Sequence, residues 1–194
     1  MSQVSTPQQV FEVDGDIVLR TAEPTDAYMI REYFVTNRDY LKPWEPKREE
    51  EFFTLSGWTQ RLIKLNELHK LGLGYYLLII DKPTGAMLGT ISFSNLTRFP
   101  FHACNVGYSL AQGEQGKGTM TRALKLAVGY MFKHQNMHRI MASYMPHNAS
   151  SEAVLKRVGF VREGFAEAYL LIDGQWRDHV LTALTNQNWE PSTL

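Results

Sequence analysis

The chain has 194 residues, 44% of them hydrophobic, and its 20 basic residues balance its 20 acidic residues. This length is sufficient for one well-buried core and short for two domains, so we expect a single domain. A formal net charge of zero gives no indication of a nucleic-acid patch or of an anionic membrane partner. The sequence contains no run of about 18 apolar residues, so no membrane-spanning helix is predicted.

The cysteine content and the N-terminus indicate the compartment. The single cysteine, Cys104, lies in an apolar segment and has no second cysteine with which to form a disulfide. A buried free thiol is typical of the reducing cytoplasm, where we expect the protein to act. Residues 1–10 are polar and lack the basic and apolar regions of a secretory signal, so they are predicted to be a flexible tail.

Hydrophobic periodicity and turn residues predict alternating strands and helices. In chain order the pattern predicts a strand at 17–22, helices at 24–37 and 49–71, strands at 75–81, 87–93 and 103–111, a helix ending near 134, a strand at 138–145, a helix at 150–158, and strands at 160–172 and 176–185. Residues 41–46 are expected to be a non-helical loop, because Pro43 and Pro46 bracket Trp44 and Glu45. No internal repeat or shift in composition marks a second domain.

The run Gln115-Gly116-Lys117-Gly118-Thr119 falls where a predicted strand gives way to a helix. The first N–H groups of a helix have no partner within the helix, its dipole is positive at that end, and glycine lets an anion approach the backbone. The run therefore predicts a phosphate site, with an ordinary glycine-rich turn as the alternative. The nucleoside-triphosphate and dinucleotide motifs do not match, because the glycines that they need are replaced by Ala111 and Thr121.

The predicted element order, with a phosphate turn between the fourth strand and the third helix, resembles that of the GCN5-related N-acetyltransferase (GNAT) family. The segments that carry the resemblance are residues 37–46 (NRDYLKPWEP), 107–109 (GYS), 115–118 (QGKG), 144–148 (YMPHN) and 171–179 (LIDGQWRDH). In one departure, Gly113 stands where the family usually has Arg or Gln. The resemblance implies an α/β domain over residues 11–194, with a mixed, mostly antiparallel sheet of about seven strands. The sheet would be splayed between its fourth and fifth strands and packed with about four helices.

The resemblance further implies acetyl-CoA as co-substrate. Its pyrophosphate would lie on backbone N–H groups of the 115–119 turn, and its pantetheine arm would pair with the strand that follows Asn105. An N–H group of this strand would also receive the oxyanion. The implied cofactor-binding residues are Val106, Gly107, Tyr108, Gln115, Gly116, Lys117, Gly118, Thr119, Asn148 and Ser151. His134, His138 and His179 lack metal-ligand spacing, and we expect no metal.

The catalytic residues are less well defined by the sequence. Residues 148–151 match the family pattern Asn-x-x-Ser, which implies that Ser151 donates a proton to the departing thiolate; the alternative is that Asn148 or Ser150 is simply a helix N-cap. Relatives often carry a glutamate on the fourth strand, where Asn105 stands here. His102 and Glu167 are the candidate bases, and each is also explained by a structural or solvated role.

By resemblance, Trp44 and Glu45 would border a groove for the N-terminal alanine of a ribosomal protein, the fifth of the small subunit, either free or in a pre-ribosomal particle. An α-amino group with a pKa near 7.7 to 8.0 is roughly a quarter neutral at about pH 7.4, against about one part in a thousand for lysine, so an N-terminus needs no strong base. The acids at 49–51 would attract a basic protein, or simply favour a helix start.

Two alternative functions remain open. The protein could be a small-amine acetyltransferase acting on a polyamine or aminoglycoside, or a non-catalytic acyl-CoA-binding module.

Overall fold

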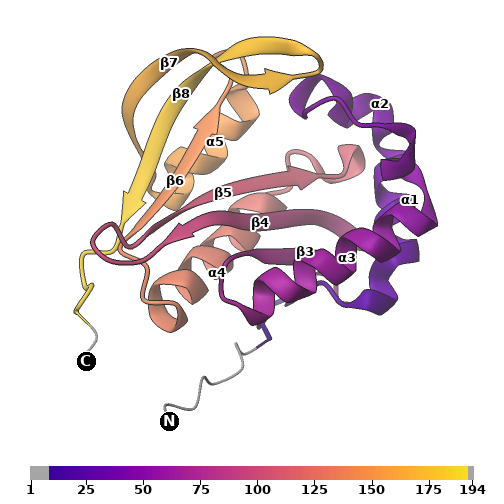
Figure 1. Cartoon of the computed structure of the whole chain (residues 1–194), viewed down its shortest axis with the longest axis horizontal. Coiled ribbons are helices and arrows are strands. Elements are labelled where there is room, and N and C mark those ends of the chain that lie inside the picture. Colours follow the sequence, from indigo (N-terminus) through magenta and orange to yellow (C-terminus); the bar gives the residue numbers. More distant parts are fainter. Residues whose placement is uncertain (1–8, 192–194) are drawn as a thin grey trace.

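The computed structural model describes residues 9–191, which form one sheet with helices packed on both faces (Figure 1). Within this range the strand order is β1-β2-β3-β4-β5-β6-β8-β7. Neighbouring strands are antiparallel except β5 and β6, which are parallel. This mixed, mostly antiparallel sheet confirms the predicted α/β fold class.

The strands are β1 (Phe11–Asp14), β2 (Ile17–Thr21), β3 (Tyr75–Asp81), β4 (Met87–Thr97), β5 (Ala103–Leu110), β6 (Arg139–Tyr144), β7 (Val161–Ile172) and β8 (Gln175–Thr185). The α-helices are α1 (Ala27–Thr36), α2 (Arg38–Leu41), α3 (Leu55–Lys70), α4 (Thr119–His134) and α5 (Ala149–Val158). Four short 3₁₀ helices complete the described elements: η1 (Pro24–Asp26), η2 (Lys42–Trp44), η3 (Glu50–Phe53) and η4 (Gln112–Glu114).

The parallel strands β5 and β6 are paired over a short stretch only. The pairing runs from Ala103 opposite Arg139 to Asn105 opposite Met141, and then stops. Beyond Asn105, β5 remains paired with β4 whereas β6 continues against β8. The sheet is therefore open between these two strands, as expected between the fourth and fifth predicted strands.

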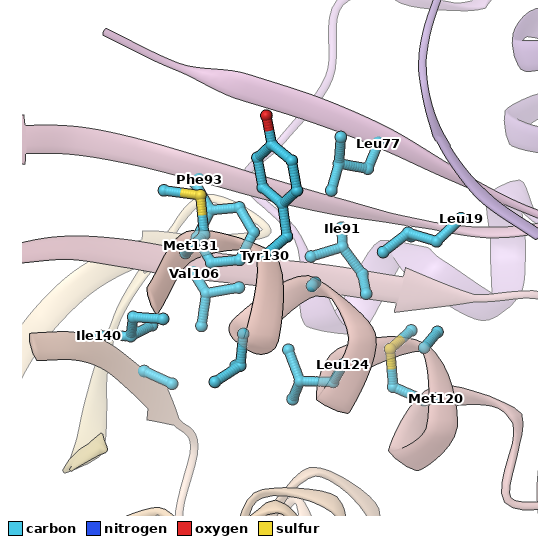
Figure 2. Packing of buried hydrophobic residues seen from close by; sticks show 14 of the residues in the cluster. Leu19, Leu77, Ile91, Phe93, Val106, Met120, Leu124, Tyr130, Met131 and Ile140 are labelled. Atoms are coloured by element: carbon cyan, nitrogen blue, oxygen red, sulfur yellow. The ribbon is translucent and has the colours of Figure 1, made fainter. Parts of the chain in front are cut away.

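The central strand β3 contributes to two hydrophobic layers. Leu77 and Ile79 pack in the cluster that contains α4, whereas Leu78 and Ile80 pack with α1 and α3. Successive side chains of a strand point to opposite faces, so an unbroken apolar run fits a strand that is covered on both faces. Figure 2 shows the first layer, in which Leu77 lies among the same set of buried side chains as Leu124 of α4.

The structure has eight strands and five α-helices in the described residues, one more of each than predicted. The additional strand, β1, pairs with β2 through a tight turn in which Gly15 has a φ of 58°. The two turn residues, Gly15-Asp16, are a hairpin signal, so the sequence contained the information for this strand. The additional helix, α2, is a single turn that follows a break at Asn37.

Two segments of the N-terminal half differ from prediction. Residues 42–44 form the 3₁₀ helix η2 because Pro43 lies in its first turn, where a missing N–H group is not needed. The chain then becomes extended at Glu45, as expected for a residue that precedes proline. The predicted helix 49–71 is interrupted at Thr54, whose side chain caps α3 by accepting a hydrogen bond from the N–H group of Gly57.

The predicted N-terminal tail, residues 1–10, differs from the structure at its last residue. Residues 1–8 of this segment lie outside the described part of the chain. Val10, by contrast, is fully buried, and its N–H group donates to the Thr21 hydroxyl at 2.8 Å. The Val10 carbonyl accepts a hydrogen bond from the Thr21 N–H group at 3.0 Å. The ordered domain therefore begins before residue 11.

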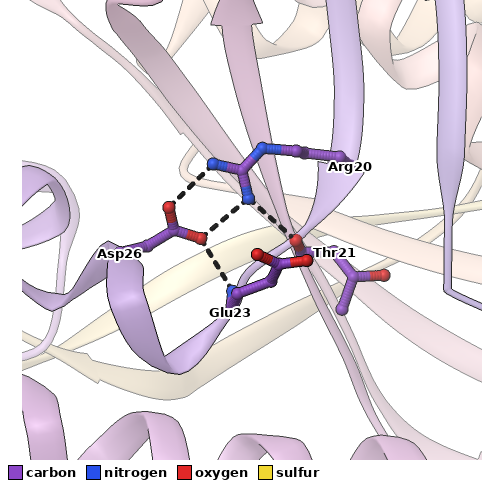
Figure 3. A network of polar contacts seen from close by, with 4 residues as sticks. All are labelled: Arg20, Thr21, Glu23 and Asp26. Carbon is purple, nitrogen blue, oxygen red and sulfur yellow. Dashed lines mark hydrogen bonds and ion pairs between the residues drawn. The ribbon is translucent and has the colours of Figure 1, made fainter.

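An ion pair fixes the junction between β2 and α1 (Figure 3). Both terminal nitrogens of Arg20 donate to the Asp26 carboxylate at 2.7 Å, and the Glu23 N–H group donates to it at the same distance. The Asp26 side chain is 9% exposed. Burial alone would raise the pKa of Asp26, but the hydrogen bonds from Arg20 and Glu23 outweigh burial and hold this pKa below its ordinary value.

We predict that Asp26→Asn lowers the free energy of unfolding by roughly 2 kcal/mol near neutral pH, since it removes charge-assisted hydrogen bonds from a buried site. A lowered pKa in the folded state stabilises the fold above the pKa of the unfolded chain, about 3.9, and this stabilisation is lost as pH falls through the folded-state value. Urea unfolding should therefore show a gap between wild type and variant that narrows in acid. Asp16→Asn, which weakens an exposed ion pair with Arg122, is the control and should lower the free energy of unfolding by less. An equal loss in the two variants would contradict the stabilising role of the buried Arg20–Asp26 pair.

Candidate acyl-transfer site

A cleft of about 810 Å³ opens between the diverging strands β5 and β6. Its walls come from the turn that precedes α4, the first turns of α5, the segment 40–45 and the β7–β8 hairpin. These segments are far apart in the sequence, and they meet where the sheet is open. The cleft is therefore the candidate functional site.

The glycine turn lies at one end of this cleft. Gly116 and Gly118 have φ angles of 75° and 76°, a left-handed conformation that glycine adopts without strain. A Cβ atom at either position would meet no atom within 4 Å, so the space above the turn is open. The Gly118 carbonyl accepts the first backbone hydrogen bond of α4, from the N–H group of Arg122. The N–H groups that precede Arg122 in this first turn therefore have no backbone partner within the helix.

Side chains at this end of the cleft also suit a phosphate. The first turn of α4 contains no acidic residue that would repel an anion. The Thr121 hydroxyl is buried at the cleft and has no hydrogen-bond partner among residues 9–191. Gln115 secures the turn, because its side-chain amide donates to the Leu110 carbonyl at 3.3 Å. An anion on this turn would satisfy the free N–H groups.

Most of the predicted cofactor residues lie together here. Those that line the cleft are Val106, Gly107, Tyr108, Gln115, Gly116, Gly118, Thr119, Asn148 and Ser151. The exception is Lys117, whose ammonium pairs instead with Glu114 at 2.9 Å on the surface. Val106 to Tyr108 lie beyond the last pair with β6, so the edge of β5 that faces the cleft has no strand partner in the described structure. Such an edge offers main-chain hydrogen bonds to an extended ligand.

Ser151 is held in the middle of the cleft by two contacts. Its N–H group donates to the side-chain oxygen of Asn148 at 3.1 Å, which makes Asn148 the N-cap of α5, as the capping alternative predicts. Its hydroxyl lies 2.7 Å from the hydroxyl of Tyr108 on β5. Burial raises the pKa of Tyr108 to about 12, so this phenol stays protonated at neutral pH and can donate a hydrogen bond.

Glu45 also lines the cleft, and its side chain is 19% exposed. Burial raises the pKa of this carboxyl group, and Arg48, at 3.5 Å, opposes the shift. The Glu45 carbonyl accepts a hydrogen bond from the N–H group of Asp173 at the tip of the β7–β8 hairpin, 2.9 Å away. The adjacent Trp44 also lines the cleft, and its ring packs on His147, with 5.4 Å between ring centroids. Both predicted acceptor residues are thus held at one opening.

The two candidate bases are not brought to the cleft. His102 precedes β5 at the closed end of the sheet, where its ring packs on Trp189 and its carbonyl accepts two backbone hydrogen bonds. Glu167 is exposed on β7 beside a register irregularity and does not line the cleft. Neither side chain borders the cleft that contains Ser151. Asn105 does border it and provides no ionisable group.

Three side chains of the site were not identified from the sequence as functional. The Tyr108 hydroxyl, Thr121 and His179 all line the cleft. Thr121 lies two residues after the glycine run 115–119, and His179 ends one of the segments that carry the family resemblance, so both positions lie in or near segments that the sequence marks. The contact between Tyr108 and Ser151 joins residues 43 positions apart, and no local signal predicts it.

Residues 9–191 contain no group of three or more His, Cys, Asp or Glu side chains that could hold a metal ion. In the same part of the chain, no helix has the length and apolar character needed to cross a membrane. Free Cys104 is buried, and burial raises the pKa of its thiol to about 12. This thiol is therefore not a reactive nucleophile.

Comparison with known proteins agrees with the geometry. Residues 16–161 match the model of the acetyltransferase (GNAT) domain family. The chain is 50% identical to the [ribosomal protein uS5]-alanine N-acetyltransferase of Escherichia coli (strain K12) over 175 residues, which cover 90% of each protein.

Two solved structures support the same assignment. The crystal structure of the ribosomal-protein-S5-alanine acetyltransferase of Vibrio fischeri has a TM-score of 0.91 and 50% identity, covering 94% of this chain and all of that one. Mycobacterium smegmatis RimJ, solved with CoA-disulfide, has a TM-score of 0.86 and 29% identity, with 96% of this chain and 91% of that chain covered. The family model, the sequence identity and the shared fold show that this chain belongs to the GNAT acetyltransferase family, enzymes that take the acetyl group from acetyl-CoA.

Proposed function

We propose that this enzyme transfers the acetyl group of acetyl-CoA directly to the α-amino group of an N-terminal alanine, and that the acceptor is the ribosomal protein uS5. The acceptor is inferred from the relatives in Escherichia coli and Vibrio fischeri, whose names give this substrate. The observation that carries the chemistry is the continuity of the cleft, since the glycine turn, Ser151 and Glu45 all line it.

This continuity favours a ternary complex. Donor and acceptor would bind in one cleft, so the acetyl group need not be carried by the protein. The deeply buried Cys104 is unsuitable as a carrier, since its pKa is raised to about 12. The amine nitrogen would therefore attack the thioester carbonyl directly.

The donor end of the cleft fits acetyl-CoA. The open space above Gly116 and Gly118, the free N–H groups of α4 and the Thr121 hydroxyl suit its pyrophosphate. Bound acetyl-CoA supplies the activated acetyl thioester. The edge of β5 from Val106 to Tyr108 would hold the extended arm and offer an N–H group to the carbonyl oxygen as negative charge develops on it.

The acceptor end fits a positively charged N-terminus. The Glu45 carboxyl group can accept hydrogen bonds from an α-amino group, and Trp44 supplies an apolar surface beside it. The N-terminal amine is itself suited to the reaction, because its pKa near 8 leaves a substantial neutral fraction at neutral pH. A lysine amine with a pKa near 10.4 would be almost fully charged.

Ser151 and Tyr108 would protonate the departing thiolate. Ser151 can donate its hydroxyl proton to sulfur while it accepts a hydrogen bond from Tyr108, which lies 2.7 Å away.

The proposed acceptor is consistent with a cytoplasmic enzyme, since ribosomal proteins are made in the cytoplasm and Cys104 is a free, buried thiol. We therefore also propose that the enzyme acts in the cytoplasm.

The glycine turn can be tested through cofactor affinity. Gly118→Glu should abolish CoA binding in calorimetry, because it places an anionic side chain where the pyrophosphate is expected and strains a left-handed residue. Gly85→Glu is the matched control: Gly85 has a φ of 73° and open surroundings but lies in the β3–β4 turn. Lys117→Ala should have a much smaller effect than Gly118→Glu. Normal CoA binding by the Gly118 variant would refute the phosphate site.

Ser151→Ala should lower kcat by roughly 100-fold and leave the CoA dissociation constant nearly unchanged, because the serine interaction strengthens only as charge develops on sulfur. Tyr108→Phe, which keeps the ring and removes the hydroxyl, should give a smaller loss of the same kind. Steady-state kinetics and calorimetry together measure this difference. If Ser151→Ala turned over normally, Ser151 would have only a structural role at the start of α5.

Acceptor choice tests the proposed substrate class. A peptide with the N-terminal sequence of uS5 should be acetylated faster as pH rises from about 7 to about 8, and the same peptide with a blocked N-terminus should not react even if it contains lysine. Mass spectrometry would locate the acetyl group. Added salt should slow the acetylation of a basic peptide more than that of a neutral peptide, because it screens the attraction between the basic peptide and the acidic side chains of Glu45 and residues 49–51. Preference for spermine or an aminoglycoside over any N-terminus would replace this proposal with the small-amine alternative.

A further inference from the structure

His179 is a buried histidine that lines the cleft. It lies on β8 opposite Ala166 of β7, and its neighbour Val180 pairs with Tyr144 at the end of β6. The residue is 4% exposed, yet it lines the cleft that also contains Ser151. A histidine in this position is within the enclosed part of the site and is not a surface residue.

The hydrogen bonds of His179 define which ring nitrogen carries the proton. Nδ1 lies 3.0 Å from the backbone carbonyl of Arg177. A carbonyl oxygen can only accept a hydrogen bond, so Nδ1 must be the donor. In a neutral imidazole the other nitrogen, Nε2, then has a free lone pair. No hydrogen bond from the described residues occupies that lone pair.

Neighbouring groups hold the ring in place. The Tyr169 ring packs on the imidazole with 5.7 Å between ring centroids, and Tyr169 also lines the cleft. The bond to the Arg177 carbonyl prevents rotation of the imidazole about its own axis. A base that is fixed in this way needs no reorganisation when its substrate arrives.

Other proton acceptors in the site are less suitable. Asn105 is neutral, and His102 and Glu167 do not line the cleft. Glu45 does line it, but its carboxylate is engaged by Arg48 at 3.5 Å. Among the described residues that line the cleft, His179 is the one that presents an imidazole. Imidazole is the side chain best suited to gain and release a proton near neutral pH.

We propose that His179 is the general base of this enzyme and accepts, at Nε2, the proton lost by the acceptor amine. This inference rests on the proposed transfer to an N-terminal amine. As the C–N bond forms, the amine proton passes to Nε2 directly or through one water molecule, and the ring becomes an imidazolium. The C–S bond breaks with its electron pair on sulfur, which receives a proton from Ser151. Water then removes the proton from the imidazolium and replaces the one given up by the hydroxyl, which restores both groups.

The tautomer is tested first, without turnover. A long-range ¹H–¹⁵N correlation spectrum of the labelled enzyme, assigned with a His179→Asn sample, should show the neutral ring protonated at Nδ1. Protonation at Nε2 would overturn the proposal, because the lone pair would then point away from the amine.

Catalysis is tested with two variants. His179→Asn keeps a donor for the Arg177 carbonyl but has no ring nitrogen in the cleft, and it should lower kcat by about 100-fold with CoA affinity within about twofold of wild type. His179→Ala should regain activity when substituted imidazoles are added, with rates that increase with imidazole pKa. A purely structural role would not give this dependence. Circular dichroism and CoA calorimetry establish that both variants are folded.

His134→Ala is the control, because His134 is exposed at the end of α4 and does not line the cleft; its activity should equal that of wild type. Full activity of His179→Asn, or a folded His179→Ala that no imidazole restores, would overturn the role of His179. A wild-type enzyme that ignores N-terminal alanine and acetylates spermine would contradict the proposed function instead. The two failures are therefore distinguishable.

Discussion

The end of pairing between β5 and β6 after Asn105 is the constraint on which the rest of the site depends. Because the two strands are parallel, their carboxyl ends lie at the same edge of the sheet, and each strand leads into a helix, β5 into α4 and β6 into α5. The N-termini of both helices therefore meet at the opening. One interruption of the ladder thus gives an unpaired strand edge, two helix starts and the space between them.

The surroundings of this opening set the protonation states of its side chains. Burial raises the pKa values of Tyr108 and Glu45, so the phenol stays neutral and the carboxyl group holds its proton more readily than it would in water. Interactions between charges and dipoles are stronger in such an enclosed place than at the surface. The same enclosure that disfavours ionised side chains therefore strengthens any interaction with a charge that develops on a substrate.

The sequence predicted the parts of the molecule that depend on local patterns. The glycine turn, the strands that flank it and the proposed cofactor residues were predicted from short segments of sequence, and all of these residues except Lys117 line one cleft. The hairpin of β1 was missed although Gly15-Asp16 signals it, and η2 was missed because proline was taken to exclude every helical form. The catalytic end could not be predicted in the same way. Ser151 and Tyr108 come into contact beside the opening between β5 and β6. His102 lies outside the cleft because it precedes β5 where this strand is still paired with β6, and that pairing is a property of the assembled sheet.

One further bond sets a dimension of the site. The side-chain oxygen of buried Asn37, at the start of the segment that carries Trp44 and Glu45, accepts a hydrogen bond from the N–H group of Gln112 at 2.9 Å. Gln112 begins the short helix η4, which leads into the glycine turn. The segment 40–45 and the glycine turn, which both line the cleft, are thus linked to each other at a point outside it. This bond therefore helps to set the spacing of two walls of the cleft before any ligand is bound, which is a form of preorganisation.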